Sequence, residues 1–254
     1  MNITTIQSDI IWEDKKQNLQ NYQKKIDSIE STDLIILPEM FTTGFTMNPE
    51  QLAESMNGET INWMKDNALR RDSAICGSLI IEEGGLYFNR FIWVNPDNSI
   101  QFYDKRHLFS FAGENEKYTP GNSKTIIEYK GWKICPMVCY DLRFPVWSRN
   151  LEDYDILIYV ANWPVKRKHA WKSLLVARAI ENQSYVIGVN RVGFDINGYF
   201  YSGETSIMNA LGEIIHIRSH SEDIYTTTLN KEELLKIRKQ LPFLSDRDNF
   251  EIIY

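Results

Sequence analysis

Residues 33–39 read DLIILPE, and residues 132–141 read WKICPMVCYD. Each stretch is an apolar run that leads to one chemically reactive side chain, Glu39 in the first and Cys139 in the second. Both runs predict strands, and the uninterrupted run at 33–37 is typical of a strand buried on both faces. In open α/β sheets, sites form beyond the ends of such strands. The two stretches therefore indicate an α/β fold and where its chemistry lies.

The rest of the chain alternates between strand and helix patterns. Helices are predicted at 14–30, 60–71, 168–182 and from Asn230 onward. Strands are predicted at 3–8, 33–37, 74–81, 86–94, 99–103, 132–138, 156–160, 185–190, 205–209, 213–216 and 224–229. So many strands usually split into two packed sheets that helices cover. We expect a layered α/β sandwich, and because no linker or repeat divides residues 1–254, we expect one domain.

Composition narrows the class of protein. The chain has 254 residues, and 28 Lys and Arg against 34 Asp and Glu give a formal charge of −6. A hydrophobic content of 43% supplies a large core and excludes a disordered protein. Basic residues form no stripe, which argues against a nucleic-acid partner. No apolar run approaches the roughly 18 residues of a membrane span, and the N-terminus lacks a signal-peptide pattern, so we expect a cytoplasmic protein that does not bind membranes.

Three cysteines, Cys76, Cys135 and Cys139, form no disulfide framework. The spacing of Cys135 and Cys139 does not match a zinc site or a redox pair. Cys76 and Cys135 lie inside predicted strands and are interpreted as core residues. Cys139 lies where a strand gives way to a predicted helix, and a thiol at a helix N-terminus has a lowered pKa. The alternative for Cys139 is also a buried core cysteine.

Glu39, Lys105 and Cys139 each end or follow a predicted strand. Alone, each has a structural interpretation: a helix cap, a solvated charge or a core thiol. The chain has no G-x-S-x-G elbow and no glycine-rich phosphate loop. A Cys–His pair stays open, although no histidine has a telling context: His107, His169, His216 and His220. A nucleophilic cysteine would then need a buried carboxylate partnered by a lysine as its base.

Three motifs carry a family resemblance. LPEMFTTGF at 37–45, DKRHLF at 104–109 and VCYDLRFP at 138–145 resemble, in order and spacing, the Glu, Lys and Cys motifs of the nitrilase superfamily of carbon-nitrogen hydrolases. ANWP at 161–164 and the segment 203–212 also look like family features. The resemblance implies a four-layer α-β-β-α sandwich of two mixed sheets flanked by helices. It further implies a homodimer or a higher homo-oligomer and requires no metal or other cofactor.

The resemblance also implies roles for individual residues. Glu39 would act as the general base, and Cys139 would attack the amide carbonyl to form a thioester. Lys105 and the backbone N–H of Tyr140 would stabilise the oxyanion. A second glutamate, seven residues before a glycine, would hold Lys105. Because Gly121 is that glycine, Glu114 is chosen over Glu116.

Within the superfamily, the TTGF, KRHLF and AGENE segments resemble bacterial omega-amidases, which hydrolyse the terminal amide of 2-oxo acid amides such as 2-oxoglutaramate or 2-oxosuccinamate. Alternatives are a deaminated-glutathione amidase, an N-carbamoyl amino acid amidohydrolase, or a non-catalytic binding module. An omega-amidase must hold a substrate carboxylate, and Arg143 is the candidate. Its alternative is a structural pair with Asp141 or Glu39. Three aromatic residues could wall the pocket: Phe45, Phe111 and Trp163.

Overall fold

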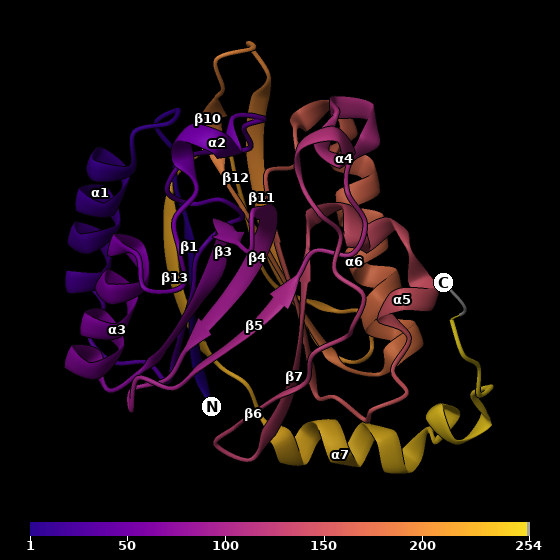
Figure 1. The fold of residues 1–254 in the computed structure, drawn as a ribbon. Coiled ribbons are helices and arrows are strands. Elements are labelled where there is room, and N and C mark those ends of the chain that lie inside the picture. The colour runs from indigo at the N-terminus through magenta and orange to yellow at the C-terminus, as the bar shows by residue number, and fades with distance from the viewer. Residues whose placement is uncertain (253–254) are drawn as a thin grey trace.

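Two β-sheets lie face to face in the computed structural model, which describes residues 1–252 (Figure 1). The six strands of the first sheet run in the order β13 (Asp223–Thr228), β1 (Asn2–Gln7), β2 (Leu34–Ile36), β3 (Ala74–Glu83), β4 (Leu86–Val94) and β5 (Ile100–Asp104). Strands β1, β2 and β3 are parallel, and the remaining pairings are antiparallel.

The second sheet repeats this plan around the parallel strands β7, β8 and β9. Its path is β10 (Val192–Phe194), β11 (Phe200–Met208), β9 (Tyr185–Asn190), β8 (Ile156–Ala161), β7 (Trp132–Val138) and β6 (Ile127–Tyr129), with β12 (Ile214–Ser219) paired to β11. Both sheets are therefore mixed, as predicted.

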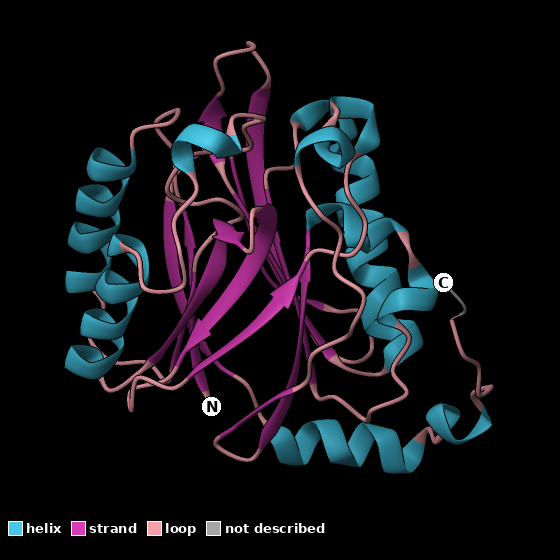
Figure 2. Ribbon diagram, viewed as in Figure 1, coloured by secondary structure: helices cyan, strands magenta, loops and turns pink. Residues whose placement is uncertain are grey.

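Helices cover the two outer faces (Figure 2). On one side lie α1 (Lys15–Asp27) and α3 (Glu59–Arg71), and on the other side lie α5 (Pro145–Ser148) and α6 (Lys168–Asn182). The short helices α2 (Pro49–Leu52) and α4 (Glu114–Lys117) lie near the upper end of the view, and α7 (Lys231–Gln240) crosses below the sheets. The predicted four-layer α-β-β-α sandwich is confirmed.

Strand β2 shows why an uninterrupted apolar run forms a strand between two layers. Leu34 and Ile36 belong to the core between the sheets, whereas Ile35 packs with side chains of α1 and α3. All three are fully buried. Because burying one such side chain contributes about 1.5–3 kcal/mol, this short strand stabilises the packing against the other sheet and against the helices.

Strand β11 departs most from the predicted strands. It begins at Phe200 rather than at residue 205. Gly203 and Glu204 have φ angles of 77° and 63°, and the register with β12 shifts between Gly203 and Thr205. This β-bulge interrupts the alternation by which a strand is recognised. The sequence also misses β6 and β10, because three residues are too few for a periodic signal.

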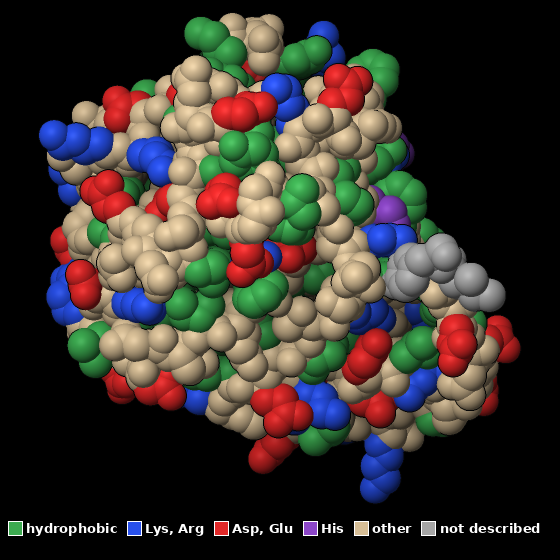
Figure 3. Space-filling view, in the orientation of Figure 1, with side chains coloured by type: hydrophobic (Ala, Val, Ile, Leu, Met, Phe, Trp, Pro, Cys, Tyr) green, Lys and Arg blue, Asp and Glu red, His purple; other side chains and the backbone are tan. Residues whose placement is uncertain are grey.

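The mixed surface charge and the lengths of the helices agree with the expectations from composition. Acidic and basic side chains are interspersed over the face shown in Figure 3. Within residues 1–252, no helix is both long enough and apolar enough to cross a membrane.

Candidate active site

Cys139 lies at the turn that follows β7, where its φ is +45°. Such a left-handed conformation costs a non-glycine residue about 1–2 kcal/mol and turns the chain sharply. A helix follows β7 as predicted, and it is a short 3₁₀ helix, η2 (Cys139–Arg143). It ends there because Pro145 keeps Phe144 out of the helical region, with φ −115° and ψ 85°.

The expected low pKa of the Cys139 thiol is wrong. Burial raises its pKa well above the ordinary value, and the nearby carboxylates of Glu39 and Glu114 raise it further, while Lys105 opposes them. The Glu39 side chain is thus one of the groups that keep the proton on the thiol. These shifts favour a neutral Cys139 thiol near the Glu39 carboxylate, rather than a thiolate made by a helix N-terminus.

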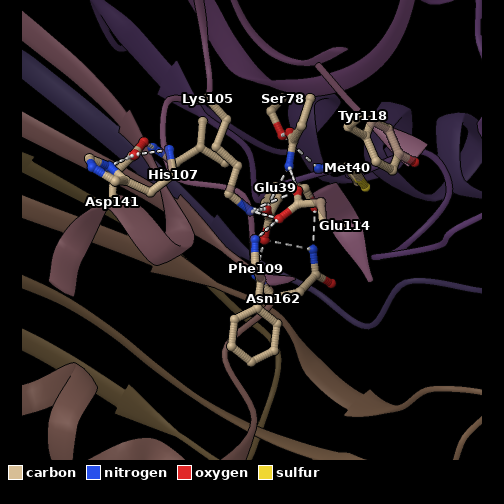
Figure 4. Close-up of polar contacts among 12 residues, drawn as sticks. Glu39, Met40, Ser78, Lys105, His107, Phe109, Glu114, Tyr118, Asp141 and Asn162 are labelled. Carbon is tan, nitrogen blue, oxygen red and sulfur yellow. Dashed lines mark hydrogen bonds and ion pairs between the residues drawn. The ribbon is translucent and has the colours of Figure 1, made fainter. Parts of the chain in front are cut away.

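Glu39 follows β2 and is fully buried. Its Oε1 accepts hydrogen bonds from Lys105 Nζ at 3.0 Å and from Asn89 Nδ2 at 2.8 Å. Its Oε2 accepts from the backbone N–H of Asn162 at 2.7 Å. Three donors thus fix both carboxylate oxygens of Glu39, and Figure 4 shows those from Lys105 and Asn162.

Lys105 follows β5, and its Nζ is shared by two carboxylates. Besides Glu39, it contacts both oxygens of Glu114 at 2.9 Å. Burial lowers the pKa of Lys105, but Glu114 and Glu39 overcome this effect and raise it above the ordinary value. Lys105 is therefore protonated. Burial raises the pKa of Glu114, and Lys105 opposes that shift.

The structure distinguishes the two glutamates that the sequence offered. Glu114 is the first residue of α4, is fully buried and bonds Lys105, whereas Glu116 is exposed.

Gly121, which follows α4, lies against the backbone of Asp104 and Lys105. A Cβ there would lie 2.2 Å from the carbonyl oxygen of Asp104, and Gly121 N–H donates to Lys105 O at 2.9 Å. This close backbone approach fixes the chain at Lys105.

Asn89 and Asn162 contact Glu39, although the sequence alone assigned no role to either side chain. Asn89 Nδ2 bridges Glu39 and Glu114, and its Oδ1 accepts from Ser78 Oγ at 2.8 Å. Asn162 holds Glu39 from the end of β8. A signal existed for both residues. Asn89 and Arg90 are the two strongly polar residues of β4, whose other residues are apolar or aromatic, and Asn162 follows a strand just as Glu39 does.

Asp141 anchors the turn that carries Cys139. Its Oδ2 accepts from Tyr103 Oη at 2.8 Å and from the backbone N–H of Val138 at 3.0 Å. Its Oδ1 lies 2.8 Å from His107 Nδ1 and accepts from the backbone N–H of His107. The structural interpretation of His107 therefore fits its surroundings. With Asp141 and Glu39 bonded elsewhere, Arg143 forms neither of its two alternative pairs.

A cavity of about 470 Å³ opens above Cys139. The predicted substrate-binding residues all line it: Phe45, Phe111, Tyr140, Arg143 and Trp163. The guanidinium of Arg143 lies 5.1 Å from the centre of the Trp163 ring. Phe111 is 85% exposed and thus stands at the mouth. Within residues 1–252, no cluster of His, Cys, Asp or Glu side chains is arranged to hold a metal ion.

Comparisons with known proteins agree with this geometry. Omega-amidase YafV from Escherichia coli is 44% identical over 254 residues, which are 99% of this chain and 98% of YafV. A 2-oxoglutaramate amidase from Bacillus subtilis is 28% identical over 96% of both chains. A Xanthomonas campestris structure, described as a CN-hydrolase superfamily protein with an arsenic adduct in its active site, has a TM-score of 0.97 and 40% identity, and covers 99% of this chain and 98% of its own. The carbon-nitrogen hydrolase profile matches residues 2–239. This chain belongs to the carbon-nitrogen hydrolase family.

Proposed function

We propose that this protein is an omega-amidase that cleaves the terminal amide of small 2-oxo dicarboxylic acid monoamides, such as 2-oxoglutaramate, to the 2-oxo acid and ammonia. One observation carries the proposal. A cysteine thiol whose pKa is raised by a nearby buried carboxylate faces a cavity that is also lined by an arginine with no carboxylate partner among residues 1–252. The names of the relatives from Escherichia coli and Bacillus subtilis support this choice.

Acylation follows from the contacts of Cys139. Glu39 takes the thiol proton as the sulfur attacks the amide carbon, so that no stable thiolate is needed. The carbonyl oxygen becomes an oxyanion, which the Lys105 ammonium and the backbone N–H of Tyr140 stabilise. One such donor is worth about 2.7–4 kcal/mol in related acyl transfers. Glu39 then gives the proton to the leaving nitrogen, the carbon–nitrogen bond breaks, and ammonia leaves a thioester on Cys139.

Deacylation reuses the same groups. Glu39 takes a proton from a water molecule that attacks the thioester carbon, and the oxyanion forms again beside Lys105. When the carbon–sulfur bond breaks, the proton returns to Cys139 and the 2-oxo acid is released. Glu114 keeps Lys105 protonated and oriented, which makes Glu114 a positioning residue.

We also propose a cytoplasmic homodimer formed by the layer that contains α6. Exposed apolar side chains support this surface, because Ile180 on α6 is 52% exposed and Ile214 on β12 is 50% exposed. A Cβ at Gly212 would lie within 2.6 Å of Ile180, which shows that the β11–β12 turn lies against α6. Light scattering on the purified protein gives the mass that tests this proposal.

Ammonia release tests the proposed reaction. The substrates are 2-oxoglutaramate, deaminated glutathione, glutamine and an N-carbamoyl amino acid, with Cys139→Ala as the control variant. We expect the highest kcat/KM on 2-oxoglutaramate and no turnover by Cys139→Ala. Unchanged turnover by Cys139→Ala contradicts the mechanism. Turnover of another substrate without 2-oxoglutaramate contradicts only the substrate class.

A further inference from the structure

The cavity above Cys139 contains a second guanidinium, that of Arg167. Arg167 ends η3 (Val165–Arg167), the turn between β8 and α6, and is half-buried. Its Cζ lies 4.9 Å from the centre of the Phe109 ring. Its backbone carbonyl accepts a hydrogen bond from Trp163 Nε1 at 2.8 Å. Because the Trp163 ring also contacts the Arg143 guanidinium, one indole contacts the side chain of Arg143 and the backbone of Arg167.

Neither arginine has its charge balanced within residues 1–252. Each guanidinium contacts an aromatic ring face, and neither forms an ion pair or a side-chain hydrogen bond with the described residues. Among those residues, Asp195 is the single carboxylate that lines the cavity. Its oxygens already accept from Tyr201 Oη at 2.9 Å and from two backbone N–H groups. Two unpaired guanidinium groups in a protein of net charge −6 are complementary to an anionic ligand.

We propose that Arg167 is a second substrate anchor, which reads the 2-oxo oxygen while Arg143 holds the neighbouring carboxylate. This inference rests on the proposed function. A 2-oxo acid presents three acceptor oxygens, and the two-point fork of one guanidinium fits only the two carboxylate oxygens. A second donor is therefore required for the third oxygen.

The same arrangement predicts selectivity for 2-oxo over 2-amino substrates. Glutamine carries an ammonium at the position of the 2-oxo oxygen, and the two guanidinium groups that line the cavity repel that charge. Phe109, which lies under Arg167, also packs against Tyr140 with ring centroids 5.0 Å apart. The Phe109 ring thus contacts both Arg167 and Tyr140, and the backbone N–H of Tyr140 is the proposed oxyanion donor.

Steady-state kinetics on two matched amides test this role. Glutaramate has the chain length of 2-oxoglutaramate but lacks the 2-oxo oxygen. For Arg167→Ala we expect the KM for 2-oxoglutaramate to rise about tenfold or more, with kcat and the KM for glutaramate changed less than about threefold. For Arg143→Ala we expect both KM values to rise. Arg167→Lys keeps the charge and should recover part of the loss.

The control variant is Lys168→Ala, which removes an exposed cation next in sequence that does not line the cavity. Its kinetics should match the wild type. An unchanged KM for 2-oxoglutaramate in a folded Arg167→Ala overturns the inference, and so does an equal rise for both amides. A wild type that turns over neither amide, while hydrolysing an N-carbamoyl amino acid, overturns the proposed function and the inference together.

Discussion

Lys105 Nζ lies 2.9 Å from both carboxylate oxygens of Glu114, inside a site where neither side chain is exposed. The same Nζ also contacts Glu39 at 3.0 Å. One buried ammonium therefore balances two buried carboxylates. Because desolvation penalises each of these charges, their mutual contacts hold the site in a single arrangement.

The first prediction concerns Lys105→Met. The variant leaves Glu39 and Glu114 without their cation, so we expect a loss of about 3–5 kcal/mol in the free energy of unfolding at pH 7. We also expect ammonia release to disappear, because the oxyanion loses a donor. Urea unfolding and the ammonia assay measure the two effects. A variant with wild-type stability would contradict the shared-cation arrangement.

Adding Glu114→Gln to Lys105→Met separates stability from activity. The double variant has one buried carboxylate fewer, so it should regain stability without regaining turnover. Low pH should act in the same direction. Burial raises the pKa of Glu114, and without Lys105 nothing comparable opposes that shift. The folded single variant therefore binds protons more readily than the unfolded chain, and its stability rises as pH falls from about 7 to about 5.

The second prediction concerns the protonation of Cys139. Because Glu39 raises the pKa of the thiol, Glu39→Gln should lower that pKa and shift alkylation by iodoacetamide to lower pH. Turnover should nevertheless be lost, because the base is gone. Mass spectrometry of the Cys139 peptide gives the alkylation rate, and the buried Cys76 supplies an internal control. A wild-type alkylation rate that does not vary between about pH 6 and 9 would indicate a preformed thiolate instead.

The third prediction concerns Asn89, which bridges the two glutamates. Asn89→Ala removes both hydrogen bonds, so we expect kcat to fall about tenfold or more while KM changes little, because Asn89 does not line the cavity. Asn115→Ala, at an exposed position of α4, is the matched control and should behave as the wild type. Equal kcat values for the two variants would remove Asn89 from the positioning of Glu39.

The fourth prediction concerns Gly121. Because a Cβ would lie 2.2 Å from the Asp104 carbonyl, Gly121→Ala must displace the backbone at Lys105. We expect a loss of about 1–3 kcal/mol in stability together with a lower kcat. Gly84→Ala meets no atom within 4 Å and carries only the strain of its φ of 62°, so it should cost about 1–2 kcal/mol and leave kcat unchanged. A wild-type kcat for Gly121→Ala would contradict the link to Lys105.

Local sequence was sufficient for the strand ends that carry the chemistry. The apolar runs of β2 and β7 lead to Glu39 and Cys139, and the strand before Lys105 is equally clear. These features depend on neighbours along the chain, which is why periodicity finds them. The motifs further identified Glu114, although only the structure shows that it bonds Lys105 and that Glu116 is exposed.

The tertiary structure decided the properties that depend on distant groups. Lys105 and Glu39 are separated by 66 residues, and Asn162 and Glu39 by 123. No local pattern records such contacts. The pKa of the Cys139 thiol depends on burial and on carboxylates from other elements, so the inference from a helix N-terminus had the wrong sign. Arg143 of η2 and Arg167 of η3 likewise line one cavity only in the folded chain, because packing brings the turns after β7 and β8 together.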